Sequence, residues 1–386
     1  VTSRPYGQNP PSHADGFRCF DIAPLTQEDV AALAARFFNR CCGEDAEASQ
    51  RQQRRFLLAI ERSASALNMS RTPLLLVIML LISRSRPLPD KRHLLYQCCL
   101  DGLLSALPDT KQDEGALLHR NQYRPDDSEE RLRLVATLAA GPVGTSEFVA
   151  LVGSAEQLAE RLPSEWPTSA PPGMTRQQAR LAFVRWLAGP AGLLNERTDG
   201  TLTFSHLSFQ EYLTAWHLHA TIEGAEARAQ AVLLRVGEKT WWETLRLWAA
   251  LIAGQSQSRI APVIGALIEG GRDGICLAGA ILADGLGEDE AFRAWKTAFV
   301  GLLCVDWPPT ILMVIDGWQA SCQEDRLGSL RESVQTLMPH VSIAAWLRLS
   351  GLCVRLGWQS IVAKEPAHLG AYTLRWLLDA KMDSAL

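Results

Sequence analysis

The sequence predicts a mainly α-helical protein of several domains. Three observations support this class: apolar residues recur at three- and four-residue spacing along most of the chain, several of these runs begin with helix-capping residues, and one segment, residues 193–204, has the pattern of a tight β-hairpin. The length of 386 residues is compatible with two to four domains.

Composition limits the classes of protein that this chain can represent. Hydrophobic residues make up 47% and charged residues 21%, and the net charge of −4 gives no reason to expect a nucleic-acid partner. The nine cysteines have no C-x-x-C spacing, which indicates reduced thiols and no zinc site. The longest apolar run, residues 74–82, is far shorter than the roughly 20 residues that span a bilayer. We expect a cytoplasmic protein that does not contact a membrane.

The first third of the chain is predicted to contain one strand and four helices. Residues 17–22 alternate between apolar and polar side chains, as a strand does. Thr26 is predicted to cap the first helix, with Asp29 reaching back to it. Thr72 followed by Pro73 marks the start of the third helix, because proline suits the first helical position. The four helices are expected at about 26–40, 50–69, 73–83 and 90–106.

The middle of the chain has the element order of a winged helix. Residues 108–130 are polar and are predicted to connect two domains. Helices follow over about 129–162 and 175–188. Asp199-Gly200, between two strand-like runs, predicts a tight type I′ hairpin, in which both central residues need positive φ. Helices, a two-stranded wing and then a closing helix are the order found in a winged-helix module.

The closing helix begins in the segment FSHLSFQEYLTA, residues 204–215. Ser208 and Glu211 have the spacing of a capping box, which predicts a helix start at Leu207 or Ser208. His206 then lies just before the helix N-terminus, where unpaired N–H groups favour an anion. From position alone, two interpretations are open: His206 contacts a phosphate, or it only caps or packs near the wing.

The remainder of the chain is predicted to be helical throughout. Apolar-periodic segments run from residue 225 to residue 380, separated by glycine, proline or acidic breaks. They have no strict repeat length, so we expect irregular stacked helical pairs resembling a solenoid. Most of the twelve tryptophans fall in this half, and helix–helix packing explains them more simply than a ligand-binding surface.

Four motifs together resemble the NACHT-type nucleotide-binding switches of the STAND class, which includes the NLR immune receptors. The resemblance covers about residues 1–220, and FxHxSFQEYLxA is its most specific motif. It implies four regions: the tail of a nucleotide-binding α/β domain (1–23), a first helical domain (24–107), a winged-helix domain (108–220) and a helical sensor region (221–386). The motifs are VTSRP (1–5), RTPLLLVIMLL (71–81), LPDKRHLLY (88–96) and FSHLSFQEYLTAWHL (204–218).

The resemblance implies a nucleotide site for ADP or ATP. By its pattern, Arg4 would sense the terminal phosphate, Pro73 would contact the adenine, and His206 would donate a hydrogen bond to the β-phosphate of ADP. The position of His206 before a predicted helix N-terminus, which follows from the neighbouring residues alone, agrees with this role.

The sequence departs from the family pattern in one respect. It contains no G-x-x-x-x-G-K-[ST] motif, and no hydrophobic strand ending in paired acids precedes VTSRP. We expect the phosphate-binding loop and the carboxylates that hold Mg²⁺ to lie before residue 1. The whole protein would then be a slow ATPase, whereas this chain alone would not hydrolyse ATP.

The family pattern implies a two-state switch in innate defence, such as bacterial anti-phage immunity. A trigger would bind the C-terminal helical region, ADP would exchange for ATP, and the protein would assemble into a homo-oligomer. Two alternatives stay open: a non-enzymatic helical scaffold derived from a NACHT module, and a winged-helix regulator whose Arg176 and Arg180 contact DNA. The second is the less favoured, because the wing adds little positive charge and the chain is acidic overall.

Overall fold

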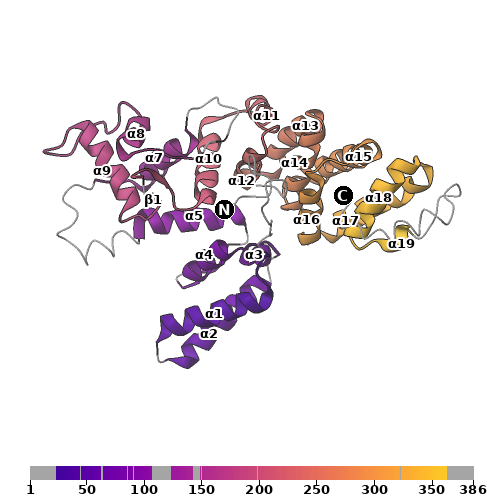
Figure 1. Cartoon of the computed structure of the whole chain (residues 1–386), viewed down its shortest axis with the longest axis horizontal. Helices are drawn as coiled ribbons and strands as arrows, with labels where there is room; N and C mark the ends of the chain where they lie inside the picture. Colours follow the sequence, from indigo (N-terminus) through magenta and orange to yellow (C-terminus); the bar gives the residue numbers. More distant parts are fainter. Residues whose placement is uncertain are drawn as a thin grey trace. The chain divides into compact units, whose positions relative to one another are not determined.

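The structure, a computed structural model, divides into two compact units between Gln255 and Ser256. Helices dominate both units, and the described strands form one two-stranded sheet (Figure 1). The prediction of a mainly α-helical fold with a winged helix and stacked helices is confirmed. The residues that the structure describes are 23–43, 45–61, 64–84, 86–89, 91–106, 123–141, 148, 150–197, 199–321 and 323–362.

Two pairs of helices open the described part of the first unit. The predicted capping box of the first helix is confirmed: the Asp29 N–H donates to Thr26 Oγ1 over 3.1 Å, and the Thr26 N–H donates to Asp29 Oδ2 over 2.9 Å. The helix predicted at 50–69 is instead two helices, and the first of them starts early because Asp45 Oδ1 accepts the Ala48 N–H. The four helices are α1 (Gln27–Cys42), α2 (Ala46–Glu61), α3 (Ala64–Ser70) and α4 (Pro73–Ser83).

Helix α5 (Arg92–Asp101) links these helices to the rest of the unit. It packs on α4 and also on α10 and α12, which come later in the chain. It continues into one turn of π-helix, η2 (Gly102–Ala106), so the element expected at 90–106 is present with a looser final turn. Three residues of α5, Leu95, Tyr96 and Leu100, are fully buried.

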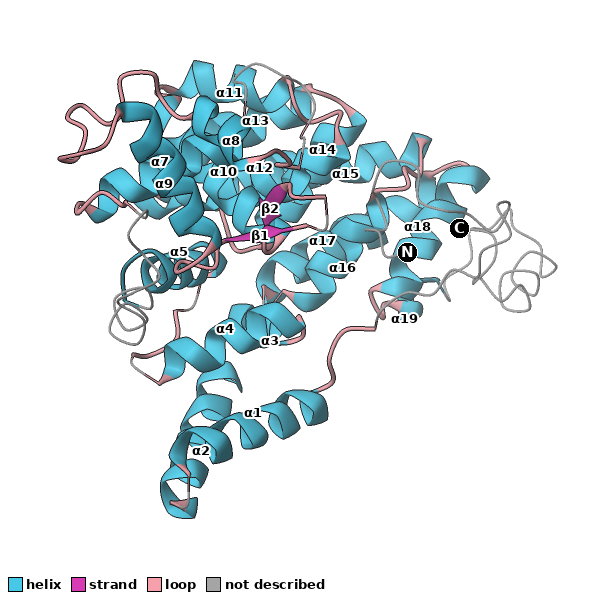
Figure 2. Cartoon of the chain, turned by 60° about the vertical axis from the view of Figure 1, so that its left-hand side comes forward, coloured by secondary structure: helices cyan, strands magenta, loops and turns pink. Residues whose placement is uncertain are grey.

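The winged helix follows. Its helices are α7 (Ser128–Ala140), α8 (Ala155–Arg161) and α9 (Arg176–Ala188). The wing pairs β1 (Leu194–Glu196) with β2 (Leu202–Phe204) in antiparallel register (Figure 2). Gly153 adds one bridge to the free edge of β2: its N–H donates to Leu202 O over 3.3 Å, and the Leu202 N–H donates to Gly153 O over 2.8 Å.

The hairpin turn differs from the predicted type I′ turn. The Arg197 N–H donates to Thr201 O over 2.8 Å, and the Gly200 N–H donates to Arg197 O over 3.0 Å. This pattern leaves a three-residue loop in which Gly200, at φ +77°, takes the left-handed position. Asp199 stabilises the loop differently than predicted, because its Oδ1 accepts the Thr201 N–H over 3.0 Å.

Helix α10 (Leu207–Thr221) is the centre of the first unit. It packs on α7, α12 and α5, and the helices α11 (Ala225–Leu233) and α12 (Trp242–Gln255) complete the unit, with the 3₁₀ turn η3 (Lys239–Trp241) between them. Because neighbours cover α10 on several sides, even polar side chains of this helix are enclosed. Its buried residues are Phe209, Gln210, Glu211, Tyr212, Leu213, Thr214, Ala215, His217 and Leu218.

The second unit consists of stacked helices, as predicted. Helix α14 packs on α13, α15 and α16, and α15 packs in addition on α13, α17 and α18. Packing on both the next helix and the one after it is typical of an irregular α-solenoid. The elements are η4 (Gln257–Ile260), α13 (Ala261–Glu269), α14 (Arg272–Ala283), α15 (Asp289–Val305), α16 (Ile311–Ala320), α17 (Glu324–Leu337), η5 (Met338–His340), α18 (Ile343–Arg355) and α19 (Gln359–Val362).

Aromatic rings form the core of the second unit. Trp295 is fully buried, and its ring stacks on Trp318 at a centroid distance of 5.4 Å and on Phe299 at 4.7 Å. A Cβ atom on Gly279 would lie 2.7 Å from the Trp295 ring, so only glycine fits at this position of α14. Tryptophan in this part of the chain therefore serves helix–helix packing, the simpler of the two explanations given above.

Candidate functional site

His206 is the N-cap of α10. Its backbone is extended, at φ −146° and ψ 135°, and its Nδ1 accepts the backbone N–H of Ser208 over 3.3 Å. A neutral imidazole that accepts at Nδ1 carries its hydrogen on Nε2. The ring is only partly buried. His206 is therefore a hydrogen-bond donor at Nε2, at a helix end whose backbone field favours an anion.

The predicted capping box of this helix is wrong. Ser208 is the second helical residue, not the cap, and Glu211 is fully buried one turn further along. The wing causes the difference: the Ser205 N–H donates to Leu193 O over 2.9 Å, which keeps the chain extended as far as His206. The helix start at Leu207 is as predicted, and the cap is supplied by the histidine itself.

An aromatic cluster fixes α5 against the first turns of α10. The ring of Tyr96 stacks on Tyr212 at a centroid distance of 5.6 Å and meets Phe209 edge to face at 6.4 Å. Burial raises the pKa of Tyr96, while the charge of Arg92 acts in the opposite direction. The ring of Tyr96 is thus packed directly on the first turns of α10.

Charged side chains extend this contact to α12. The guanidinium of Arg92 pairs with the carboxylate of Glu243, and Arg246 Nη1 lies 3.5 Å from Glu243 Oε2. All three side chains are largely buried, with exposures of 28% for Arg92, 21% for Glu243 and 17% for Arg246. The motif LPDKRHLLY contains Arg92 and Tyr96, but the sequence alone gives no sign that Glu243 is their partner.

Pro73 lies on the first turn of α4, where its side chain is exposed. The exposed Thr72 precedes it as the N-cap, although its side chain makes no capping hydrogen bond. Helix α4 packs on α5, and α5 packs on α10, so α5 connects the two helices that carry Pro73 and His206. Arg4 and the strand predicted at 17–22 lie outside the described residues.

The arginines of α9 bind the protein's own backbone. Arg180 Nε donates to Trp166 O over 2.7 Å, and its Nη2 donates to Pro163 O. Arg176 Nη2 donates to Thr168 O over 3.2 Å. In a DNA-binding winged helix the equivalent helix enters the major groove. Here its arginines instead hold the 163–168 loop against the helix.

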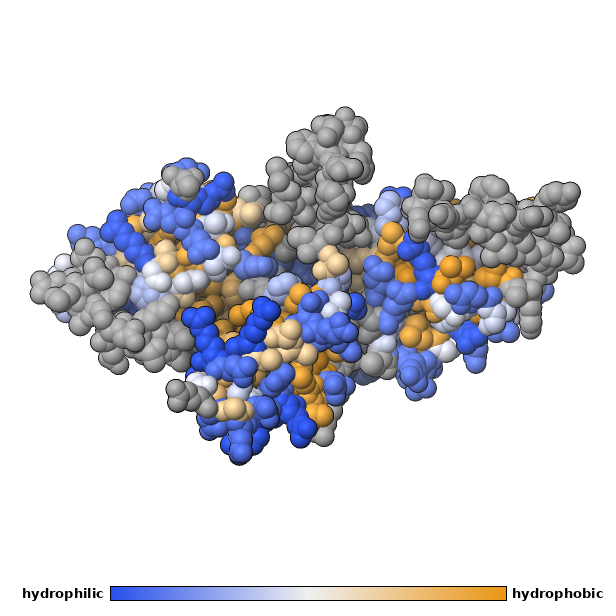
Figure 3. All heavy atoms as spheres, turned by 60° about the horizontal axis from the view of Figure 1, so that its bottom comes forward, coloured by the Kyte–Doolittle hydropathy of each residue, from blue (hydrophilic) through white to orange (hydrophobic). Residues whose placement is uncertain are grey.

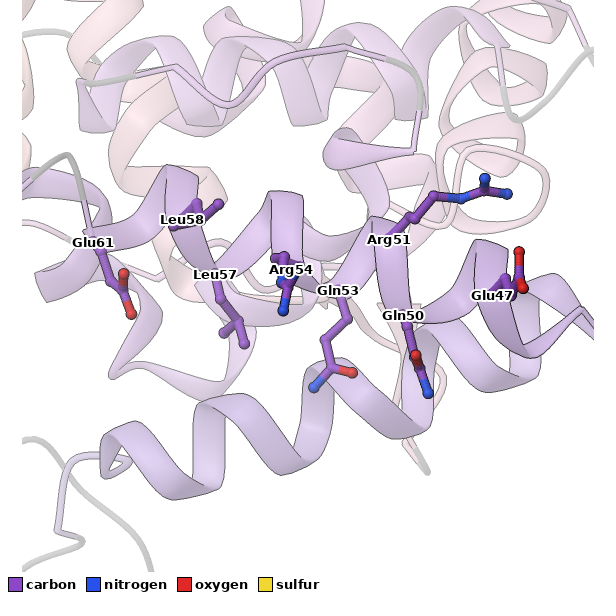
Figure 4. A pocket seen from close by; sticks show the side chains of 8 residues that line it. All are labelled: Glu47, Gln50, Arg51, Gln53, Arg54, Leu57, Leu58 and Glu61. Atoms are coloured by element: carbon purple, nitrogen blue, oxygen red, sulfur yellow. The ribbon is translucent and has the colours of Figure 1, made fainter.

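Two of the surface grooves in the described part of the chain are lined by neither Pro73 nor His206. One, of about 730 Å³, follows α2 and is lined by charged and amide side chains beside Leu57 and Leu58 (Figure 4). The other, of about 740 Å³, lies between α15 and α17. Hydrophobic and hydrophilic side chains adjoin over the face shown in Figure 3, without a single dominant patch.

The described residues contain neither a candidate metal site nor a membrane-spanning helix. No group of three or more His, Cys, Asp or Glu side chains in these ranges could hold a metal ion. Across the same part of the chain, no helix combines the length and the apolar character needed to cross a bilayer.

The comparison with protein families identifies the module around His206. Residues 92–218 match the family described as "Winged helix-turn-helix domain C-terminal to NACHT". The chain carries the NACHT-associated winged helix. The match begins at Arg92 and so includes α5 with the three helices and the wing of the fold. No curated protein matches the chain.

Arg92, Tyr96, His206 and Ser208 all belong to the matched segment, whereas Glu243 lies beyond it. The packing of α5 on α10 explains why α5 accompanies the winged helix: the contact between Tyr96 and the first turns of α10 is part of the domain's own core.

Proposed function

We propose that the chain is the regulatory part of a nucleotide-dependent switch in a NACHT-type protein. Its central contact is a hydrogen bond from His206 Nε2 to the β-phosphate of ADP, with Pro73 against the adenine and Arg4 near the terminal phosphate. The observation that carries the proposal is the capping geometry of His206, whose Nδ1 already accepts the Ser208 N–H. That bond leaves the hydrogen on Nε2, as an anion requires.

The residues present suit a nucleoside diphosphate. A partly exposed imidazole donor at a helix N-terminus matches a phosphate oxygen, and an exposed proline ring on α4 offers an apolar surface for a purine. Bound nucleotide would supply the negative charge that His206 binds. Mg²⁺ would be held by residues outside this chain, together with the phosphate-binding loop.

In the resting state these contacts would hold the helical domain and the winged helix together. Binding of a trigger to the stacked helices would favour an open state, which would release ADP, accept ATP and assemble into a homo-oligomer. Such coupling requires the trigger to bind the open state more tightly than the closed state. The role in innate defence, including defence against phage, is part of this proposal and rests on the family resemblance.

The two alternative functions require other contacts than the nucleotide-dependent switch does. A DNA-binding regulator needs basic side chains directed at phosphates, whereas Arg176 and Arg180 donate to backbone carbonyls of the adjacent loop. A non-enzymatic scaffold requires no ligand at His206. Nucleotide retention therefore separates the switch from the scaffold.

The test uses the protein expressed from its complete reading frame. Wild-type protein should retain ADP through gel filtration, measured by chromatography of the heat-released nucleotide. His206→Ala should bind ADP about 10- to 100-fold more weakly, because a hydrogen bond to a charged group is lost. The same variant should oligomerise without trigger, measured by light scattering.

Two matched variants separate ligand binding from capping. Asparagine is a good N-cap, so His206→Asn should keep the thermal stability of the wild type and still lose ADP. His219→Ala, at the far end of the same helix, should retain ADP, because this imidazole contacts Gln255. Wild-type protein without nucleotide, or equal ADP content in all four proteins, would contradict the proposal.

A further inference from the structure

We propose that the outer face of α2 binds the same face of a second copy of this chain, in an antiparallel two-fold contact. The face, called here the α2 face, consists of four residues that line the groove along this helix (Figure 4). Neither nucleotide nor trigger takes part in the contact, so it goes beyond the proposed switch. The residues of the α2 face are Arg54, Leu57, Leu58 and Glu61.

The α2 face points away from the helix that covers α2. Helix α2 packs on α1 through the opposite side, because at 3.6 residues per turn the four residues of the face fall well apart from its buried positions. Leu58 is 44% exposed, Leu57 is half-buried beside α1, and both charged residues of the face are exposed. Two leucines are thus available to a partner. The buried residues of α2 are Ser49, Phe56 and Ile60.

The order of side chains along the α2 face is complementary to itself. Arg54 lies at one end, Glu61 lies two helical turns later at the other end, and the two leucines lie between them (Figure 4). The midpoint between residues 54 and 61 is also the midpoint between residues 57 and 58. An antiparallel copy whose two-fold axis passes through this midpoint places Arg54 opposite the partner's Glu61. A two-fold contact requires such reciprocity.

The same arrangement places apolar side chains at the centre of the contact. Leu57 lies opposite the partner's Leu58, and Leu58 lies opposite the partner's Leu57, so four leucines meet near the axis with an ion pair on each side. Residues 54, 57 and 61 also have the spacing with which paired helices contact each other in coiled coils.

Charge selects both the occupant and its direction. In a parallel pair, Arg54 would face the partner's Arg54, and Glu61 would face the partner's Glu61, which places like charges together at both ends. Only the antiparallel direction brings opposite charges together while keeping the leucines in contact. The α2 face therefore fits a reversed copy of itself.

The contact should be weak, because it involves only two turns of each helix. Stable interfaces bury roughly 1,200–2,000 Å², which is more than two helical turns can supply, so we expect a dissociation constant on the order of 100 µM. Sedimentation equilibrium at protein concentrations up to about 500 µM covers this range. The measurement uses the protein expressed from its complete reading frame, without trigger and without added nucleotide.

The test exchanges the charges of the α2 face. Arg54→Glu and Glu61→Arg each create two like-charge pairs in the dimer, so each should raise the dissociation constant at least about 10-fold. The double variant Arg54→Glu/Glu61→Arg forms the same two ion pairs with the signs exchanged. It should return the dissociation constant to within about 3-fold of the wild-type value.

Arg51→Glu is the matched control. Arg51 is exposed on the same helix and lines the same groove, but it lies outside the segment from residue 54 to residue 61. The same change of charge at this position should alter the dissociation constant less than about 2-fold. Thermal unfolding verifies that every variant is folded, which the exposure of all three positions favours.

Three results would overturn the proposal. The first is a wild-type protein that stays monomeric over the whole concentration range. The second is a dimer that Arg54→Glu weakens no more than Arg51→Glu does, which would place the contact on another face. The third is a double variant as weak as its two parent variants, which would exclude the pairing of Arg54 with the partner's Glu61. Restoration by the double variant supports the antiparallel contact, because parallel helices would gain nothing from the exchange.

Discussion

The centre of the first unit and the centre of the second are built from different side chains. Helix α10 is buried among its neighbours, yet it carries Gln210 and Glu211. The amide of Gln210 accepts the Leu151 N–H over 2.9 Å and donates to Ala139 O over 3.2 Å. In the second unit, the corresponding position is taken by Trp295 and the rings stacked on it.

The difference matters because the two kinds of contact respond to different events. Hydrogen bonds and ion pairs depend on protonation, on charge and on the alignment of a few atoms. Close-packed rings and backbones depend on volume and shape, which a ligand or a proton does not alter. We therefore expect acid to destabilise the first unit more than the second.

The largest expected effect is at the aromatic core of the second unit. Trp295→Ala should lower the free energy of unfolding of this unit by about 3–5 kcal/mol, because it removes a fully buried ring and leaves a cavity. Urea unfolding monitored by far-UV circular dichroism measures the loss. Hydrogen exchange in α10 should be unchanged if the two units are stabilised independently.

Trp307→Ala is the matched control, because Trp307 is only partly buried in the same unit. Trp307→Ala should lower the free energy of unfolding clearly less than Trp295→Ala does. Equal losses for the two tryptophans would mean that stacking around Trp295 does not define the core.

A smaller effect is expected where two helices of the second unit approach each other. A Cβ atom on Gly274 of α14 would lie 1.9 Å from the carbonyl oxygen of Leu267 on α13. Gly274→Ala should therefore destabilise the unit by about 1–3 kcal/mol through overpacking. Thermal unfolding, compared with that of the wild type, measures this loss.

Gly265→Ala provides the contrast on α13. Its Cβ would meet nothing within 4 Å, so alanine should be neutral or stabilising by up to about 1 kcal/mol through higher helix propensity. If both alanines were tolerated alike, the close approach of α13 and α14 would not be a determinant of stability.

How much of the fold can be predicted from the sequence depends on whether neighbouring or distant residues determine where an element begins and ends. Thr26 and Pro73 specify helix starts through neighbours within three residues, and both starts were predicted. The N-cap of α10 was not predicted correctly, because two polar residues, His206 and Ser208, are both suitable N-caps. Strand pairing of the wing, a tertiary effect, decides which of them has an extended backbone.

The same limit applies to the candidate site. His206 could be proposed from its motif, whereas the ion pair between Arg92 and Glu243 could not, because nothing in the sequence places α12 beside α5. The hairpin illustrates the point on a smaller scale. Asp199-Gly200 marks the turn, but the register of Glu196 opposite Leu202 sets a three-residue loop in place of a two-residue loop.

The last prediction tests whether acid destabilises the first unit and not the second. His93 on α5 is 5% exposed, and burial, with the charge of Lys91 acting in the same direction, lowers its pKa from 6.5 to about 4. The unfolded chain then binds more protons than the folded one below pH 6.5, so stability falls as the pH is lowered from 6.5 towards 4. In the second unit, burial raises the pKa of Asp316, which changes stability in the opposite direction.

His93 should therefore contribute a loss on the order of 2 kcal/mol between urea unfolding at pH 6.5 and at pH 4.5. His93→Gln should remove this part and leave the part due to His217, whose pKa burial also lowers. A Cβ atom on Gly254 of α12 would lie 3.5 Å from His93 Nε2, so protonation places a charge directly against α12. Hydrogen exchange should rise at α5, α10 and α12 and stay constant in α14 and α15. A uniform rise in both units would show that the polar and aromatic cores unfold together, and the contrast between them would then have no functional meaning.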